Sequence, residues 1–320
     1  MYFCCGTTLP ERIYMNELFF VFANSITSLV LCMAVGFFCF RKKILTDTHV
    51  SGLTDLIIKV SLPATIFTSL MRPFSRELLF DLLMAIVFFA ALTLLAGTLG
   101  GGLAKLMKAT KDETEAWQFG SAFGNIAFMG IPIVNAVFGP EGVIFVAMSM
   151  IASNLLSFTY GLRIFNAKPK IDVLSICKNT PALPTVLVGF VMFLTGIRLP
   201  SPVENGIGFL SGITTPISMI VIGAVLAKEN LREALLDLRI LPHSFLRLVF
   251  FPIATLLILR AVFGDTLMVN VLVALKAMPV AAMTVILAEK HAKHPGISAR
   301  FVVVTTLLSI VTVPLISLLL

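Results

Sequence analysis

Two polar side chains of this sequence occur deep inside apolar segments, where they could do chemistry. Lys276 lies well inside the segment 266–289, and Asn125 lies inside the segment 115–139. A lysine at such depth in a membrane costs several kcal/mol unless it faces water, a partner or an anion. These residue types therefore predict a site in which a positive charge and an amide bind a small anion.

Prolines lie close to both polar residues and recur at matching positions in the two halves of the chain. Pro63 pairs with Pro216, and Pro132 pairs with Pro279, with half a chain-length between the partners. Broken helices at corresponding positions of two halves are the best sequence indication of a transporter's binding site. Pro63, Pro132 and Pro279 are therefore predicted binding residues.

The segment 115–139 carries Gly130 and Pro132 shortly after Asn125. Proline has no N–H to donate, and it suits the first turn of a helix. We predict a break near residues 128–131 and a second half-helix that starts at Pro132, with Asn125 and Gly130 as binding residues beside the break. The alternative is a proline kink with glycines that pack against neighbouring helices.

The segment 266–289 repeats this pattern, because Pro279 follows Lys276 by one helical turn. Pro279 is predicted to start a second half-helix, whose N-terminus presents free N–H groups and a positive dipole. Lys276 and two half-helix N-termini, from segments that cross antiparallel, would form an anion site. The alternative is that Lys276 pairs with a carboxylate in a structural ion pair.

A further pair of charges, Asp55 and Lys59, lies in the apolar segment 50–72. An acid and a base four residues apart on a helix usually form an ion pair. We favour a structural ion pair, and a role of Asp55 in proton or sodium coupling is the open alternative.

Composition places these residues in a polytopic membrane protein. Of the 320 residues, 58% are hydrophobic and 13% are charged, whereas soluble domains carry roughly 25% charged residues. The net charge of +7 does not indicate a nucleic-acid partner, because the basic residues lie in short loops between apolar segments. The cysteines and histidines form neither a disulfide framework nor a metal site. No cluster of nucleophile and base indicates an enzyme, and no cofactor is expected.

About ten apolar segments are long enough to span a bilayer, which predicts an all-α fold. They are 17–40, 50–72, 78–104, 115–139, 141–163, 180–199, 205–228, 240–262, 266–289 and 297–319. Residues 15–163 and 180–320 form two five-helix repeats, joined by a cytosolic linker at 164–179. Residues 1–14 lack the basic region and apolar core of a signal peptide. They are interpreted as a tail, or as the result of a start codon assigned too far upstream.

Basic residues predict the orientation, because cytoplasmic loops carry an excess of Lys and Arg. The connections after the first, third, fifth, seventh and ninth segments hold most of the Lys and Arg of this chain. Both termini are therefore predicted to be extracytoplasmic, in the inner (plasma) membrane of the cell. Because each half has an odd number of spans, the second half inserts upside down, and segments 4 and 9 are the broken, crossing helices of an inverted repeat.

The residues around these breaks resemble the auxin efflux carrier family, which includes plant auxin carriers and bacterial malate or malonate permeases. The resemblance is carried by Gly124-Asn125, Gly130-Ile131-Pro132, Ser61-Leu62-Pro63-Ala64 and Lys276-Ala277-Met278-Pro279, and it extends over 15–320. It implies a scaffold of spans 1, 2, 6 and 7 and a moving transport domain of spans 3–5 and 8–10. It also implies an anion site where spans 4 and 9 cross, and a homodimer formed through spans 2 and 7 of the scaffold.

The predicted function is secondary transport of small organic anions, such as the carboxylates malate or malonate, by alternating access. Lys276 would attract the carboxylate, Asn125 would hydrogen-bond it, and a proton or sodium ion is a candidate coupling ion. A cation–proton antiporter on the same fold is one alternative, and it would require buried carboxylates at the crossing. A ligand-sensing membrane receptor without net transport is the other.

Overall fold

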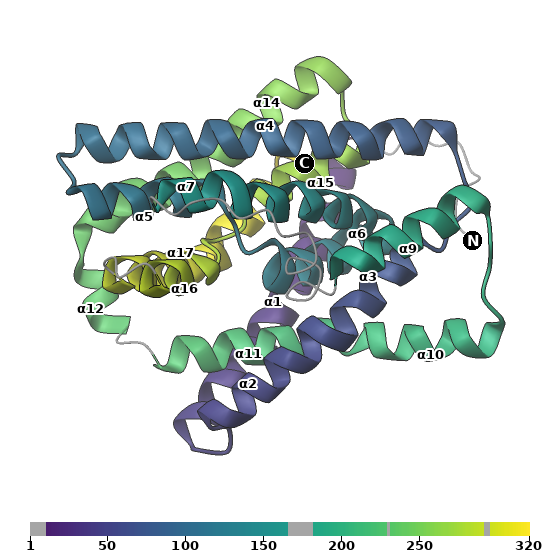
Figure 1. The fold of residues 1–320 in the computed structure, drawn as a ribbon, viewed down its shortest axis with the longest axis horizontal. Helices are drawn as coiled ribbons and strands as arrows, with labels where there is room; N and C mark the ends of the chain where they lie inside the picture. The colour runs from purple at the N-terminus through teal and green to yellow at the C-terminus, as the bar shows by residue number, and fades with distance from the viewer. Residues whose placement is uncertain (1–10, 166–181, 229–230, 291–294) are drawn as a thin grey trace.

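The computed structural model describes residues 11–165, 182–228, 231–290 and 295–320, and this part of the chain is helical (Figure 1). Seven helical stretches in it are long and apolar enough to cross a membrane. They are Asn24–Arg41, Asp47–Leu70, Arg76–Leu106, Ile126–Ile164, Ser201–Lys228, Leu238–Phe263 and Gly296–Ser317. Two shorter apolar helices, Ala182–Thr195 and Leu267–Lys276, accompany them. The protein is therefore an all-helical, multi-pass membrane protein, while its arrangement as ten spans in inverted repeats stays a prediction.

The first half of the chain runs from α1 to α7. Its elements are α1 (Glu11–Arg41), α2 (Asp47–Leu56), η1 (Ile57–Ser61), α3 (Leu62–Leu70), α4 (Arg76–Leu106), α5 (Lys111–Ala122), η2 (Ile126–Gly130), α6 (Ile131–Leu156), η3 (Ser157–Gly161) and α7 (Leu162–Ile164). Within α6, Gly139 has a φ of 64° and precedes Pro140. This interruption lies between the predicted segments 115–139 and 141–163.

The second half runs from α9 to α17. Its elements are α9 (Ala182–Thr195), α10 (Ser201–Gly212), α11 (Thr214–Lys228), α12 (Leu231–Leu236), η4 (Leu238–Ile240), α13 (Leu241–Phe245), η5 (Leu246–Phe250), α14 (Phe251–Phe263), α15 (Leu267–Lys276), α16 (Met283–Lys290) and α17 (Pro295–Ser317). Most of the predicted linker 164–179 and most of the predicted tail 1–14 lie outside the described residues, so both assignments stay predictions.

Three prolines follow directly on widened π-helical turns. Pro63, Pro132 and Pro252 each occupy the second position of an α-helix that continues from η1, η2 or η5. A proline in a regular helix clashes with the carbonyl one turn earlier and leaves it without a donor. A π turn shifts the bonding to five residues back, as in the 3.0 Å bond from Gly130 N to the carbonyl of Asn125. The chain therefore passes these prolines without a break.

The backbones of two long helices pack directly against each other where α1 meets α11. A Cβ atom on Gly36 would overlap the carbonyl oxygen of Ile220, and one on Gly223 would overlap that of Met33. Small residues at such contacts let two backbones approach directly, which is a common way to join helices in membranes. Gly36 and Gly223 therefore fix α1 against α11 without intervening side chains.

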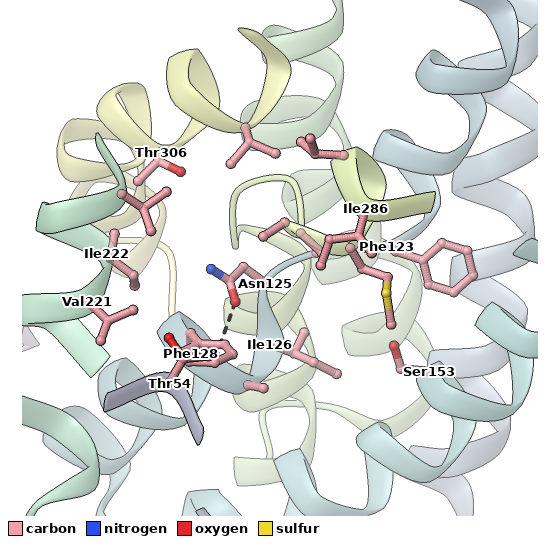
Figure 2. Close-up of a pocket in the computed structure, with 18 of the residues that line it drawn as sticks. Thr54, Phe123, Asn125, Ile126, Phe128, Ser153, Val221, Ile222, Ile286 and Thr306 are labelled. Carbon is pink, nitrogen blue, oxygen red and sulfur yellow. Dashed lines mark hydrogen bonds between the residues drawn. The ribbon is translucent and has the colours of Figure 1, made fainter. Parts of the chain in front are cut away.

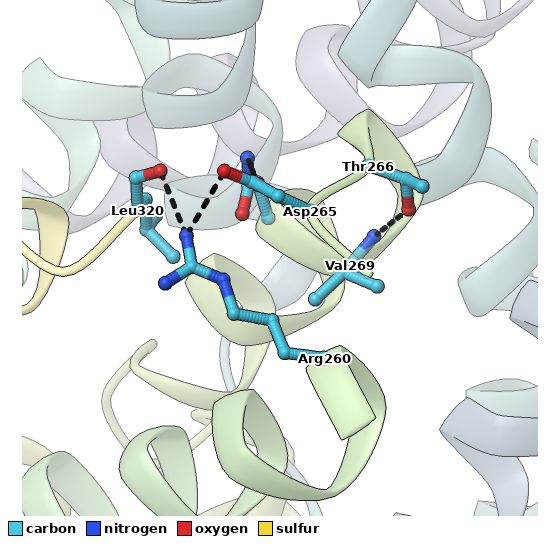
Figure 3. Close-up of polar contacts among 6 residues, drawn as sticks. Arg260, Asp265, Thr266, Val269 and Leu320 are labelled. Carbon is cyan, nitrogen blue, oxygen red and sulfur yellow. Dashed lines mark hydrogen bonds and ion pairs between the residues drawn. The ribbon is translucent and has the colours of Figure 1, made fainter. Parts of the chain in front are cut away.

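A polar cluster sets the start of α15 at the turn after α14 (Figure 3). Arg260 Nη2 donates to the carbonyl oxygen of Leu320 at 3.1 Å and lies 3.4 Å from a carboxylate oxygen of Asp265. Thr266 caps α15, because its hydroxyl accepts a 3.3 Å bond from Val269 N. These contacts hold the end of α15 that lies away from its break.

The two ends of the molecule are distinct in Figure 1. The turn between α4 and α5 and the short helix α12 lie at the left end, and the α9–α10 connection lies at the right end. Lys108 lies in the first of these turns, and Arg239 follows α12. The left end thus gathers connections that the sequence predicts to be cytoplasmic.

Candidate functional site

Two helices are interrupted in the middle of the protein, and the interruptions cross each other. Between α5 and η2, and between α15 and α16, the chain is extended, and the two extended segments pair antiparallel. Asn125 N donates to the carbonyl of Pro279 at 2.8 Å, and Ala281 N donates to the carbonyl of Phe123 at 3.2 Å. The partner segment thus satisfies some of the backbone groups that the breaks free, as a membrane interior requires.

The first break lies at residues 123–125, so the predicted break near 128–131 is wrong. Asn125 caps the following turn, because its Oδ1 accepts a 3.2 Å bond from Phe128 N. Asparagine is among the best N-cap residues. The cap thus sets the start of the second half-helix at Ile126, and Pro132 lies inside that half-helix because a π turn accommodates it.

The second break covers residues 277–282, and the half-helix α16 begins at Met283. The prediction that Pro279 opens this half-helix is therefore wrong. The carbonyl of Pro279 accepts from Asn125, and Val280 N donates to the Thr305 hydroxyl at 3.0 Å. Because these groups already have partners outside the segment, Pro279 and Val280 stay extended.

A cavity of about 540 Å³ opens beside the crossing (Figure 2). Its volume is in the range that suits a small organic molecule. Its lining is mostly apolar and includes no Lys, Arg, Asp or Glu among the described residues. The polar side chains on its wall are those of Thr54, Asn125, Ser153, Asn154, Ser157 and Thr306.

Asn125 is the predicted binding residue that reaches this cavity. Figure 2 shows its side chain between Val221 and Ile222 on one side and Ile286 on the other. Its oxygen is engaged with Phe128 N, which leaves its amide nitrogen to donate to a bound molecule. Asn125 therefore both caps the half-helix and offers a donor to the cavity.

Both second half-helices start on the wall of the cavity. Ile126 and Ala127 of η2 line it, and so do Ala282 and Met283 at the start of α16. The first N–H groups of a helix have no intrahelical partner and carry a positive partial charge. Neither first turn contains an acidic residue, so no negative side chain neutralises either positive end there.

Lys276 lies behind the crossing and does not line the cavity. Its side chain is 1% exposed, Nζ donates to the Thr93 hydroxyl at 2.7 Å, and the charge lies 4.2 Å from the centre of the Phe89 ring. A hydroxyl and an aromatic face are suitable partners for a buried ammonium. Direct contact with a molecule in the cavity would require Nζ to leave both partners.

The other predicted site residues lie outside the cavity as well. Gly130 and Pro132 are buried, and a Cβ on Gly130 would lie 3.0 Å from the Leu275 side chain. Pro63 follows η1 in the helix α3. The crossing thus joins Asn125 to Pro279 and leaves Gly130, Pro132 and Pro63 as helix-packing positions in this conformation.

Asp55 and Lys59 form the ion pair that the sequence favours. Lys59 Nζ lies 2.8 Å from Asp55 Oδ2, and the side chains are 62% and 59% exposed. Neither lines the cavity. Among the described residues, no group of three or more His, Cys, Asp or Glu side chains could hold a metal ion.

Sequence reasoning missed Arg247, although its depth in the segment 240–262 is as unusual as that of Lys276. Arg247 is 1% exposed and reaches the crossing from η5. Sequence reasoning also missed Thr93 and Thr305, whose hydroxyl oxygens accept hydrogen bonds from Lys276 Nζ and Val280 N. A threonine in an apolar helix gives no such signal, because it usually bonds to its own backbone.

Comparison with known proteins shows which family this chain resembles. A family model described as membrane transport protein matches residues 21–176 and 170–317. An uncharacterized transporter of Methanocaldococcus jannaschii is 26% identical over 89% of this chain and 94% of its own length. The uncharacterized transporter YfdV of Escherichia coli is 22% identical, over 92% of this chain and 96% of its own length.

A further relative, from Rhizobium meliloti, carries a name that proposes a malonate transporter. It is 23% identical over 65% of this chain and 68% of its own length. The family match covers almost the whole sequence, and it agrees with the resemblance that the residues around the breaks indicate. The chain therefore belongs to this auxin efflux carrier-like family of membrane transport proteins.

Proposed function

We propose that this protein is a secondary transporter of small organic anions, with short carboxylates such as malonate as its substrate class. The observation that carries the proposal is the cavity beside the crossing, which receives two positive half-helix ends and the Asn125 amide but no acidic side chain. A carboxylate there would accept hydrogen bonds from Asn125 Nδ2 and from the backbone N–H groups of Ala127 and Met283, which line the cavity at the starts of the two half-helices. Malonate is named for the Rhizobium meliloti relative, which makes it the first substrate to test.

Lys276 would support this site through its charge. It is the last residue of α15, directly before the break at residues 277–282. A buried cation is screened much less than a surface charge, so it favours an anion nearby even while Thr93 holds it. Asn125 and the half-helix ends make the direct contacts in this conformation, and Lys276 is the predicted long-range attraction.

The position of the cavity fits alternating access between two groups of helices. One wall is made by Thr54, Ile58 and residues of α11, which belong to the proposed scaffold. The other walls come from the crossing, α6, α16 and α17, which belong to the proposed transport domain. Movement of this domain past a scaffold that α1 and α11 hold together would expose the site to each side in turn. We retain the ten-span inverted repeat as the framework for this movement.

Two alternatives are less well supported. A cation–proton antiporter would need a carboxylate at the crossing, and residues 123–125 and 277–282 contain no Asp or Glu. A receptor without transport would bind the anion but carry no flux.

The proposed transporter acts in the inner membrane, with a proton or sodium ion as candidate coupling partner. The α10 helix, which has no buried residue, is a suitable surface for the homodimer through spans 2 and 7.

We predict that both chain termini are extracytoplasmic. Single cysteines at Lys108, in the basic α4–α5 turn, and at Leu199, in the α9–α10 connection, are expected to face opposite sides. In a cysteine-free background, a membrane-impermeant maleimide applied to intact cells should label position 199 and spare position 108. The reverse labelling pattern would overturn the orientation.

We expect purified protein in detergent to bind malonate and to discriminate against malonamide, its uncharged isostere. The half-helix ends attract the charge, so calorimetry should give an affinity for malonamide at least about tenfold weaker. Proteoliposomes should accumulate labelled malonate, and unlabelled malonate on the opposite side should accelerate its exchange.

Three outcomes decide among the alternatives. Malonate binding without malonate flux, in proteoliposomes at a malonate concentration that saturates the binding site, would favour the receptor. Equal affinity for malonate and malonamide would contradict an anion site. Lys276→Met, which keeps the length of the side chain but removes its charge, should weaken malonate binding. Unchanged malonate affinity in this variant would leave Lys276 with a structural role only.

A further inference from the structure

Arg247 joins the two interrupted helices and does not line the cavity. Its Nη1 donates to the carbonyl of Ser121 at 2.8 Å, and its Nε donates to the carbonyl of Met278 at 2.9 Å. Ser121 belongs to the last turn of α5, and Met278 lies two residues after α15. One guanidinium therefore satisfies carbonyls at the C-terminal ends of α5 and α15, the half-helices that precede the two breaks. A helix leaves the carbonyls at this end without partners.

The charges at the crossing are distributed unevenly. A crossing of two broken helices brings together two positive N-terminal ends and two negative C-terminal ends, whose fields oppose each other. Here the C-terminal ends receive two buried cations, Arg247 and Lys276. The first turns of the N-terminal ends contain no acidic residue. These two cations shift the field of the crossing towards positive. The first turns of both N-terminal ends line the cavity, together with Phe119 and Phe123 at the C-terminal end of α5.

We propose that Arg247 is a positioning residue that determines selectivity for anions. It neutralises the C-terminal ends of α5 and α15 and holds the two extended segments together, so that both half-helix N-termini point into one cavity. Arg247 is absent from the lining of that cavity, so it acts on the substrate through the half-helices. This inference rests on the proposed function, because it explains why that site takes an anion.

Gly124 is the matching part of this arrangement. A Cβ at position 124 would overlap Arg247 Nη2, and it would also approach the carbonyl of Met278 at 3.4 Å. Glycine is therefore required for the guanidinium to enter between the two segments. Gly124→Ala should displace the guanidinium without removing its charge from the protein.

The test compares affinities for malonate and for uncharged malonamide, measured by calorimetry on purified variants. Arg247→Met keeps the length of the side chain but removes charge and donors, and it should weaken malonate binding by about tenfold to a hundredfold. Malonamide affinity should change much less, so that discrimination between the two ligands is lost. Arg247→Lys keeps a positive charge but lacks the planar guanidinium and its several N–H donors. This variant should keep part of the discrimination between malonate and malonamide.

Gly124→Ala provides a second route in case Arg247→Met does not assemble. Gly102→Ala is its matched control, because Gly102 in α4 has open space at the Cβ position. Gly124→Ala should lose discrimination and Gly102→Ala should keep it. An equal loss of both affinities in Arg247→Met would mean a purely structural role, and unchanged affinities would also overturn the inference. If the unaltered protein binds no carboxylate, the proposed function itself has failed, which distinguishes the two results.

Discussion

Asn125→Asp is expected to abolish binding of carboxylates while the protein still assembles. The aspartate oxygen can accept the bond from Phe128 N that Asn125 makes, and Asp is as good an N-cap as Asn. The new negative charge would lie where the substrate carboxylate is expected. Two like charges about 4 Å apart repel by roughly 4 kcal/mol at the effective dielectric of a partly buried site, which is close to a thousandfold in affinity.

The matched control is Asn125→Ser, which keeps an oxygen for the cap but adds no charge. It loses one hydrogen bond to the substrate, so a loss of about tenfold is expected. Calorimetry with malonate, together with size-exclusion profiles that report assembly, separates the two variants. Retention of malonate binding in Asn125→Asp would show that the anion does not occupy the cavity beside Asn125.

Gly223→Ala is expected to destabilise the assembled protein more than other glycine substitutions in the same span. The new Cβ would overlap the carbonyl oxygen of Met33 on α1, so the two helix backbones must separate. Overpacking of this kind costs typically 1–3 kcal/mol. Thermal unfolding of the purified protein should report a lower midpoint temperature.

Gly208→Ala in α10 is the control, because nothing lies near the Cβ position there. Replacing an unconstrained helix glycine by alanine should stabilise by about 0.5–1 kcal/mol. The two substitutions are therefore expected to shift the midpoint in opposite directions. A stabilised Gly223→Ala variant would mean that α1 and α11 do not pack backbone to backbone.

The sequence predicts the class of fold and the crossing of two interrupted helices, because both depend on residues that are costly in a membrane. Asn125, Pro279 and Lys276 are unusual in apolar segments, and the structure places the crossing among them. The same reasoning placed the breaks wrongly, because it took proline as the point of interruption. Asn125 starts the half-helix by capping it, and a π turn absorbs Pro132.

Other parts of the site depend on contacts between distant segments. The hydrogen-bond acceptors for Lys276 and Arg247 are a threonine hydroxyl and two backbone carbonyls. Backbone carbonyls carry no sequence signature, and Thr93 is one of several threonines in apolar helices. Depth in the membrane marks a cation as needing partners, but only the folded arrangement shows which groups provide them.

The contact between α1 and α11 has a consequence for biogenesis. Gly36 emerges from the ribosome long before Gly223, and each of these glycines packs against the backbone of the other helix. Membrane helices insert first and associate afterwards, so the glycine face of α1 must wait in the lipid, or against an insertion chaperone, while the rest of the chain is synthesised. A truncated chain that ends before α11 should therefore be a preferred substrate of membrane quality-control proteases.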